Sequence, residues 1–185
     1  MLPFAAPDAP AWSADESVVL DRRDGRFSLK DAGSRVLSGA ATVTPFSLVI
    51  DVGHAEIYGF GAATGAATRN GASFRVMTRD TLLYGIPGAS YTALPFFIAL
   101  DGTRTVGVLV ATTYPVDVAV RNGQVCLTGA CDTEASPVDV VVFRGSLVEI
   151  VRDLAALVGR SFLPPAWALR FHQSRWSYRT MANEI

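Results

Sequence analysis

Short runs in which apolar and polar residues alternate fill most of the chain up to residue 144, and turns separate them. Three of these turns contain Asp24-Gly25, Asp101-Gly102 and Asn122-Gly123. Such pairs favour two-residue hairpin turns because both turn positions require positive φ, so we predict three β-hairpins. The run 137–143 is almost continuously apolar, which is typical of a strand buried between two layers. These patterns predict a mainly β fold, an antiparallel β-sandwich.

The hydrophobic period changes from two to about 3.6 after Gly145. Ser146 and Glu149 have the spacing of a capping box, and Gly159 stands where the end of a helix favours positive φ. The apolar positions between them fall on one helical face: Leu147, Ile150, Val151, Leu154, Leu157 and Val158. The pattern predicts an amphipathic helix whose apolar face is buried against another part of the protein.

A new element is predicted after this helix. Pro164 and Pro165 stop whatever precedes them. Trp167, Leu169 and Phe171 then alternate with smaller or polar residues at the period of a strand, so we expect a strand here.

Composition restricts the functions that the chain can have. A chain of 185 residues suits one domain with an appendage, and disorder is disfavoured because half of the residues are hydrophobic and 18% are charged. The net charge is −1 and the basic residues are scattered, which argues against a nucleic-acid partner. No apolar run is long enough to span a membrane, and residues 1–8 lack the segments of a secretion signal. We therefore expect a cytoplasmic protein.

Few residues suggest metal or cofactor chemistry. His54 and His172 have no second histidine or cysteine near them in sequence, so we expect no metal site and no cofactor. Cys126 and Cys131 stand on either side of a predicted turn, a spacing that permits a hairpin disulfide. Two cysteines in a cytoplasmic chain are more often free thiols, so both alternatives stay open.

Glycines and aromatic residues each allow a functional and a structural interpretation. Gly59, Gly61 and Gly65 lie close together, but their spacing is not GxGxxG and no helical pattern follows, which disfavours a nucleotide site. The aromatic residues of the predicted strands fit core packing better than a platform for a ligand.

The segment 160–178 carries the most distinctive residues. Pro164-Pro165-Ala166-Trp167-Ala168-Leu169, followed by the run 172–178, resembles the junction between two domains in glycoside hydrolase family 31, the α-glucosidase and α-xylosidase family. The resemblance implies a galactose mutarotase-like β-sandwich at 1–145 and a connecting helix and linker at 146–163. Residues 164–185 would then begin a catalytic (β/α)8 barrel, truncated after its first strand.

Two further segments carry the same resemblance. Tyr58-Gly59-Phe60-Gly61 with Thr64-Gly65 resembles the family signature Tyr-Gly-Leu-Gly followed by Glu-Arg-Thr-Gly, but alanines occupy 62 and 63, where the family has charged residues. The run 91–96 resembles the family's Tyr-x-x-x-Pro-Phe start of a strand.

The resemblance implies three substrate-binding residues. Asp80 matches the aspartate of the family's Trp-Asn-x-Asp loop, whose carboxylate accepts hydrogen bonds from the sugar in the first subsite. Its alternative role is a solvated loop acid or a local turn former. Trp176 matches an aromatic residue that lines the first subsite, and its alternative role is packing in the barrel core. Tyr178 follows on the same loop as a weaker candidate.

Catalytic residues are expected to lie outside this chain. Retaining glycosidases use two carboxyl groups about 5 Å apart. In family 31 both are aspartates on later barrel strands, so the resemblance implies the N-terminal portion of a retaining α-glycosidase that is inactive by itself. Its partners would be the rest of the barrel and an α-glycoside or oligosaccharide substrate. Two alternatives are a free-standing carbohydrate-binding β-sandwich and an interaction domain with Trp167, Phe171 and Trp176 facing a partner.

Overall fold

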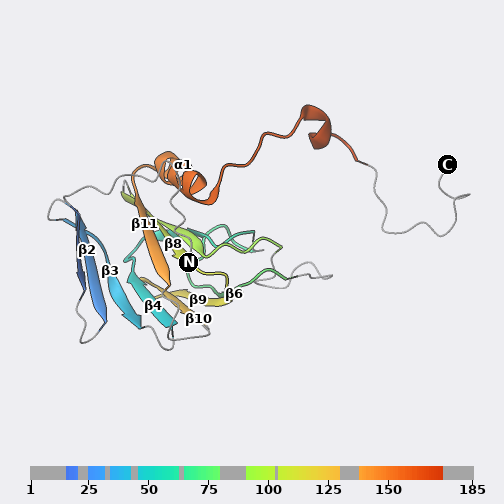
Figure 1. Ribbon diagram of the computed structural model, residues 1–185. Coiled ribbons are helices and arrows are strands. Elements are labelled where there is room, and N and C mark those ends of the chain that lie inside the picture. The colour runs from blue at the N-terminus through green and yellow to red at the C-terminus, as the bar shows by residue number, and fades with distance from the viewer. Residues whose placement is uncertain are drawn as a thin grey trace, which may run out of the picture.

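The protein is a sandwich of two antiparallel β-sheets with one helix against its outside (Figure 1). The computed structural model describes residues 16–20, 25–31, 34–42, 46–62, 65–79, 91–102, 104–129 and 138–172. The larger sheet has the order β1-β2-β3-β4-β10-β9-β6 and the smaller the order β11-β8-β7-β5. All pairings between these strands are antiparallel, which confirms the predicted sandwich.

The seven strands of the larger sheet are β1 (Glu16–Leu20), β2 (Arg26–Asp31), β3 (Ser34–Thr42), β4 (Phe46–Asp51), β6 (Ser73–Val76), β9 (Val116–Arg121) and β10 (Gln124–Gly129). The four strands of the smaller sheet are β5 (Glu56–Gly59), β7 (Phe96–Asp101), β8 (Arg104–Ala111) and β11 (Asp139–Arg144). Within the described residues two helices follow, α1 (Leu147–Val158) and the 3-10 helix η1 (Ala166–Leu169).

Alternation along the strands builds the core between the sheets. Val116, Val118 and Val120 of β9 point inward, while the residues between them are less buried. Strand β7 has no such alternation because both of its faces are covered, by the larger sheet on one side and by α1 on the other. The hydrophobic core therefore has two parts. Phe97 belongs to the part between the sheets, and Phe96 belongs to the part between the smaller sheet and α1.

The three predicted hairpins are confirmed, but their turns differ in detail. Arg121 pairs with Gln124, and Asn122 and Gly123 between them have φ of 52° and 70°, as a two-residue turn of this kind requires. In the β7–β8 hairpin Asp101 itself pairs with Arg104, so the turn lies one residue later than Asp101-Gly102. The first hairpin is longer than predicted, since residues 21–26 separate the paired Leu20 and Phe27.

Strand β11 is only partly buried, although its apolar sequence predicts full burial. It lies at the edge of the smaller sheet, so only one neighbouring strand covers its side. Val142 packs on the core between the sheets and Val141 packs under α1, but Val140 is 38% exposed.

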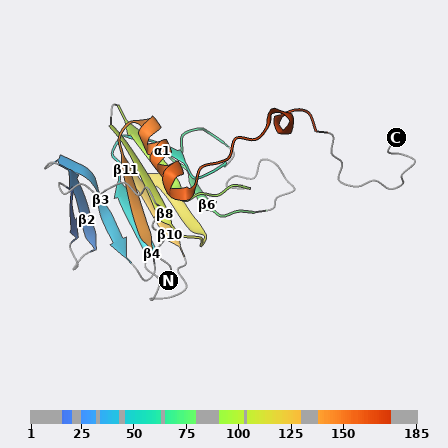
Figure 2. The same cartoon turned by 45° about the horizontal axis from the view of Figure 1, so that its top comes forward.

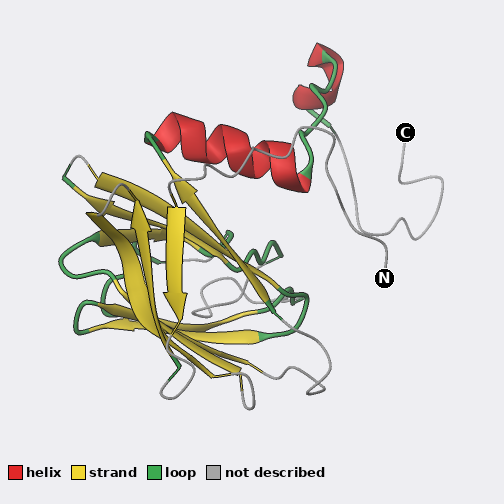
Figure 3. Cartoon of the chain, turned by 60° about the vertical axis from the view of Figure 1, so that its left-hand side comes forward, coloured by secondary structure: helices red, strands yellow, loops and turns green. Residues whose placement is uncertain are grey.

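Helix α1 is confirmed with its predicted ends, while only part of its apolar face is buried. Ser146 is the N-cap and Gly159 the C-cap, and the helix lies against β11 and β8. Figure 3 shows the helix on the outside of the sheets. Ile150 is fully buried, and Gly107 of β8 makes room for it, since a Cβ at Gly107 would lie 2.7 Å from Cγ2 of Ile150. Leu147 and Val151 are each 50% exposed, because the smaller sheet covers only one side of the apolar face.

The strand predicted at Trp167, Leu169 and Phe171 is wrong. Ala166–Leu169 is a 3-10 helix, in which the backbone N–H of Ala168 donates to the carbonyl of Pro165 at 2.9 Å. A strand needs a hydrogen-bonded neighbour, and none of the described strands pairs with this segment. The segment stands away from the sandwich (Figure 2). In the described part of the chain, no helix has the length and apolar character needed to cross a membrane.

Candidate functional site

The three predicted substrate-binding residues, Asp80, Trp176 and Tyr178, lie outside the described residues, so the structure neither brings them together nor separates them. Their neighbours in sequence are described. Strand β6 ends at Val76, and the exposed Thr78 and Arg79 lead from it toward position 80. The site can therefore be built from the elements that hold β6 in place.

The segment Tyr58-Gly59-Phe60-Gly61 holds β5 against the chain that precedes β7. Gly59, Phe60 and Gly61 have φ of 118°, 67° and 86°. The backbone N–H of Phe60 donates to the carbonyl of Phe96 at 2.8 Å. A Cβ at Gly61 would lie 2.1 Å from the carbonyl oxygen of Thr92, so the glycine permits a backbone contact that a side chain would block. These glycines thus serve close packing of two chain segments.

Phe60 is the anchor of this segment. Its left-handed backbone costs about 1–2 kcal/mol in a residue with a side chain. Its ring is only 2% exposed, and burying such a ring contributes roughly 1.5–3 kcal/mol. The ring stacks on Phe97 of β7 at 5.4 Å and meets Phe74 of β6 edge-on at 5.3 Å. The three rings connect the smaller sheet to β6, and the prediction that strand aromatics pack in the core is confirmed for Phe60, Phe74 and Phe97.

Arg69 and Asn70 occupy the place of a neighbouring strand beside β5. The backbone N–H of Arg69 donates to the carbonyl of Ile57 at 2.7 Å. The side-chain amide of Asn70 accepts from the N–H of Ile57 at 2.8 Å and donates to the carbonyl of Ala55 at 2.9 Å. The Arg69 guanidinium lies 5.9 Å from the centre of the Phe74 ring, within reach of a cation–π contact. The edge of β5 is therefore occupied, and Arg69 and Asn70, which lead into β6, are fixed beside it.

An ion pair aligns β6 with β9. Arg75 and Asp117 lie directly opposite each other in the ladder, and two nitrogens of the guanidinium each contact a carboxylate oxygen at 2.7 Å. The hydrogen bonds from Arg75 lower the pKa of Asp117, and the same contact raises the pKa of Arg75. Both side chains are half exposed, so we expect this pair to contribute little to stability and mainly to fix the register.

Metal and thiol chemistry receive no support from the described residues. In those ranges no group of three or more His, Cys, Asp or Glu residues is placed to hold a metal ion. Cys126 lies on β10, and Cys131 is outside the described residues, so the hairpin disulfide remains an open alternative.

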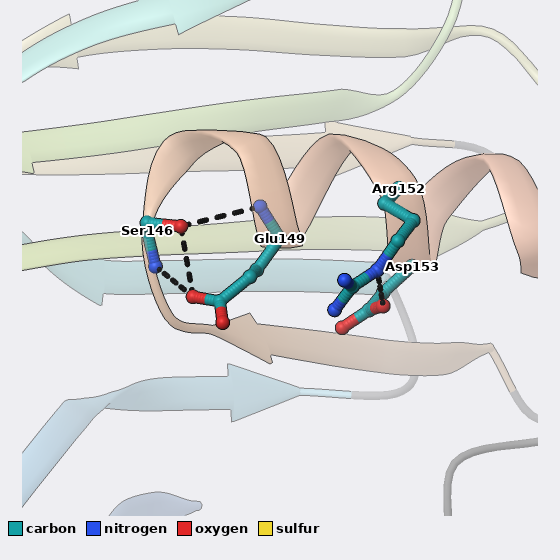
Figure 4. A network of polar contacts seen from close by, with 4 residues as sticks. All are labelled: Ser146, Glu149, Arg152 and Asp153. Atoms are coloured by element: carbon teal, nitrogen blue, oxygen red, sulfur yellow. Dashed lines mark hydrogen bonds and ion pairs between the residues drawn. The ribbon is translucent and has the colours of Figure 1, made fainter.

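The start of α1 carries a complete capping box (Figure 4). The backbone N–H and the hydroxyl of Ser146 each donate to Oε2 of Glu149 at 2.8 Å. In return, the Ser146 hydroxyl accepts from the backbone N–H of Glu149 at 3.4 Å. The backbone hydrogen bond, followed by that of the hydroxyl, lowers the pKa of Glu149.

We expect the first turn of α1 to loosen in acid. A carboxylate whose pKa is lowered by folding stabilises the folded state fully above its unfolded pKa of 4.5, and this contribution is lost as pH falls through the lower folded value. The protection of the first-turn amides of α1 against hydrogen exchange, taken relative to the intrinsic exchange rate at each pH, should therefore fall below about pH 4.5. Glu149→Gln should remove this loss of protection. Titration of the Glu149 carboxyl at or above 4.5 in carbon NMR would contradict the account.

Beyond the buried stripe of α1, apolar side chains continue across the helix surface and along the segment that follows. The exposed large hydrophobic residues here are Leu147, Val148, Val151, Val158, Phe162, Leu163, Trp167, Leu169 and Phe171. We call them the α1–η1 apolar surface. Phe162 is 79% exposed and Leu163 91%. Large contiguous apolar patches mark surfaces that other parts of a protein or a partner cover.

Sequence reasoning missed the residues that position β6. No sequence pattern points to Arg69 or Asn70 as positioning residues, and Phe60 is predicted only as part of the family signature. A bulky aromatic residue between two glycines was the available signal, since it predicts a backbone that bends sharply to bury one ring.

Comparison with known proteins agrees with this architecture. The family described as the glycosyl hydrolase 31 N-terminal galactose mutarotase-like domain matches residues 8–118. Alpha-glucosidase 2 of Bacillus thermoamyloliquefaciens is 29% identical over 183 residues, covering 91% of this chain and 22% of the relative. Human neutral alpha-glucosidase AB is 30% identical over 140 residues, which cover 64% of this chain and 15% of the relative.

A solved structure shares the fold. The family 31 dextranase of Flavobacterium johnsoniae, in complex with glucose, superposes with a TM-score of 0.64 at 18% identity, covering 86% of this chain and 20% of the dextranase. The chain thus spans about a fifth of the length of the proteins that it matches over most of its own length. On the family match, the chain belongs to glycoside hydrolase family 31, as its galactose mutarotase-like N-terminal domain.

Proposed function

We propose that the chain is the N-terminal part of a retaining α-glycosidase that hydrolyses terminal α-glucosidic or related α-glycosidic bonds. The proposal is supported by the family match and by the two α-glucosidases among its relatives. Its partners are an α-glycoside or oligosaccharide substrate and the remainder of a catalytic (β/α)8 barrel. Residues 1–145 form the sandwich, 146–163 the connecting helix and linker, and 164–185 the start of the barrel.

The observation that carries the proposal is the α1–η1 apolar surface. Burying apolar surface stabilises a protein by roughly 25 cal/mol per square ångström. A run of large exposed apolar side chains is therefore unfavourable unless another part of the protein or a partner covers it. The surface lies on α1 and on the segment after it, which are the elements that the resemblance assigns to the junction with the barrel. We infer that the barrel packs here.

The domain contributes to substrate binding by positioning the loop that carries Asp80. Strand β6, which is fixed to both sheets by Phe74 and by the Arg75–Asp117 pair, holds the start of the loop that carries Asp80. A carboxylate at the end of this loop can accept hydrogen bonds from two neighbouring sugar hydroxyls. Trp176 and Tyr178 would supply apolar faces for the sugar ring from the barrel side. The two carboxyl groups that break the bond, about 5 Å apart, belong to the barrel.

Hydrolysis of p-nitrophenyl α-glucoside and α-xyloside tests the proposal. Two proteins are compared: the 185-residue chain alone, and the chain expressed together with the coding sequence that follows Ile185, which we call the extended protein. We expect the extended protein to release p-nitrophenol and the chain alone to release none, because the catalytic carboxyl groups come from later barrel strands. Release in proportion to the concentration of the pure chain, or an inactive extended protein, would overturn the proposal.

A further inference from the structure

Two cavities meet on the larger sheet at a place unrelated to the α1–η1 apolar surface. The first, about 260 Å³, lies where the end of β4 and the start of β3 face the β7–β8 hairpin of the other sheet. The second, about 490 Å³, lies over β2, β3, β4 and β10. Arg35, Ser38 and Asp51 line both. We call the two cavities together the Asp51 cleft.

A hydrogen-bonded row of polar side chains forms the wall between the two cavities. Ser38 pairs with Asp51 across β3 and β4, and its hydroxyl donates to Oδ2 of Asp51 at 3.2 Å. Gln124 pairs with Asp51 across β10 and β4, and its side-chain amide donates to Oδ1 at 2.8 Å. Each carboxylate oxygen has two lone-pair sites, so both can accept one further hydrogen bond from a ligand.

The shape of the first cavity depends on a β-bulge. Leu37 pairs with Leu29 and Arg35 with Lys30, so Val36 is an extra residue in β3. The guanidinium of Arg104, from the other sheet, donates to the carbonyl of Arg35 at 2.6 Å and also to that of Val36. Bulges redirect side chains and are enriched beside binding sites. Here the bulge and Arg104 connect the two sheets at the cavity and place Arg35 on its lining.

The chemistry of the lining selects the class of ligand. The innermost lining residues of the first cavity are buried and apolar, among them Leu37, Ala99 and Val106. Arg35 and Arg104 are balanced there by Asp51 and Asp101. An anion would meet the two carboxylates and a cation the two guanidinium groups, whereas a neutral polyol can donate to the acids and accept from the bases. A pyranose presents an apolar ring face and polar hydroxyl groups, and a cavity with an apolar floor and a few polar groups above it can contact both.

We propose that the Asp51 cleft binds a neutral saccharide. Asp51 accepts hydrogen bonds from sugar hydroxyls, Gln124 holds the carboxylate in place, and Arg35 donates to a ring or hydroxyl oxygen. The identity of the saccharide as an α-glucoside rests on the proposed function, whereas the presence of the site does not.

Titration of the isotope-labelled 185-residue chain with isomaltose, followed by amide NMR, tests the proposal. We expect saturable shifts of residues around Ser38, Asp51 and Gln124, with a Kd in the millimolar range. Asp51→Asn keeps the shape of the side chain and removes its charge, so the Kd should rise about tenfold. The matched control is Asp139→Asn, an exposed acid on β11 that lines neither cavity, and the Kd should not change.

Three outcomes would overturn the site: no saturable shifts with isomaltose, equal affinity in the Asp51→Asn and Asp139→Asn proteins, or tighter binding of inorganic phosphate than of isomaltose. If Asp51→Asn does not fold, Gln124→Ala replaces it, with the same expected loss. The titration uses the chain alone, so a negative result would argue against this site but not against hydrolysis by the extended protein. An inactive extended protein would in turn argue against the proposed function but not against this site.

Discussion

Replacing Phe97 by alanine is expected to lower the free energy of unfolding of the chain by about 3–5 kcal/mol, the usual cost of truncating a buried aromatic residue. Phe97 has no exposed side-chain surface, and it stacks on Phe60 between the two sheets. Its loss leaves a cavity that a paired sheet on each side prevents from collapsing. Urea unfolding followed by circular dichroism measures the change.

Phe162→Ala is the matched control for this prediction. The same atoms are removed from a ring that is 79% exposed, so the free energy of unfolding of the isolated chain should change by less than about 0.5 kcal/mol. Equal destabilisation by the two substitutions would contradict the placement of Phe97 between the sheets.

An acid placed in the α1–η1 apolar surface is expected to have little effect on the isolated chain but to damage the extended protein. Val151 is 50% exposed in the chain, so Val151→Asp should leave the stability of the isolated chain within about 0.5 kcal/mol. In the extended protein the same carboxylate would be buried without a partner, which costs roughly 3 kcal/mol or more. We therefore expect the extended protein to lose most of its glycosidase activity and to unfold at a lower temperature.

Arg152→Asp provides the control on the same helix. Arg152 points to solvent, where its guanidinium contacts Asp153 at 3.3 Å (Figure 4), and such exposed pairs contribute little. This variant should keep the activity and melting temperature of the extended protein. An active, fully stable Val151→Asp extended protein would mean that the barrel does not cover this part of α1.

Local signals explain which parts of the fold could be predicted from the sequence. Asn122-Gly123 and the Ser146–Glu149 pair act through backbone conformation and hydrogen bonds within a few residues, and both features appear as predicted. Alternation along the strands depends only on which face meets the core, so the sandwich was also predictable.

Predictions that depend on distant neighbours were less accurate. The apolar alternation around Trp167 predicts a strand, but none of the described strands pairs with it, and the chain forms a 3-10 helix. The apolar face of α1 is wider than the sheet under it, so Val151 remains exposed while Ile150 is buried. The Asp51 cleft was missed because its residues come from six strands, with no spacing that links them in sequence.

The candidate site was predictable only as far as the resemblance extends. Asp80, Trp176 and Tyr178 remain predictions, as does the cytoplasmic location. What the structure adds is a physical role for the signature around Phe60, which connects β6 to the smaller sheet.

Amide hydrogen exchange across residues 160–171, compared between the isolated chain and the extended protein, tests most directly whether the α1–η1 apolar surface is an interface with the catalytic barrel. In the isolated chain these amides should exchange fast, because few of them have hydrogen-bond partners within the described residues. Burial against the barrel should slow them by at least about tenfold in the extended protein. Equally fast exchange in both proteins would contradict the account.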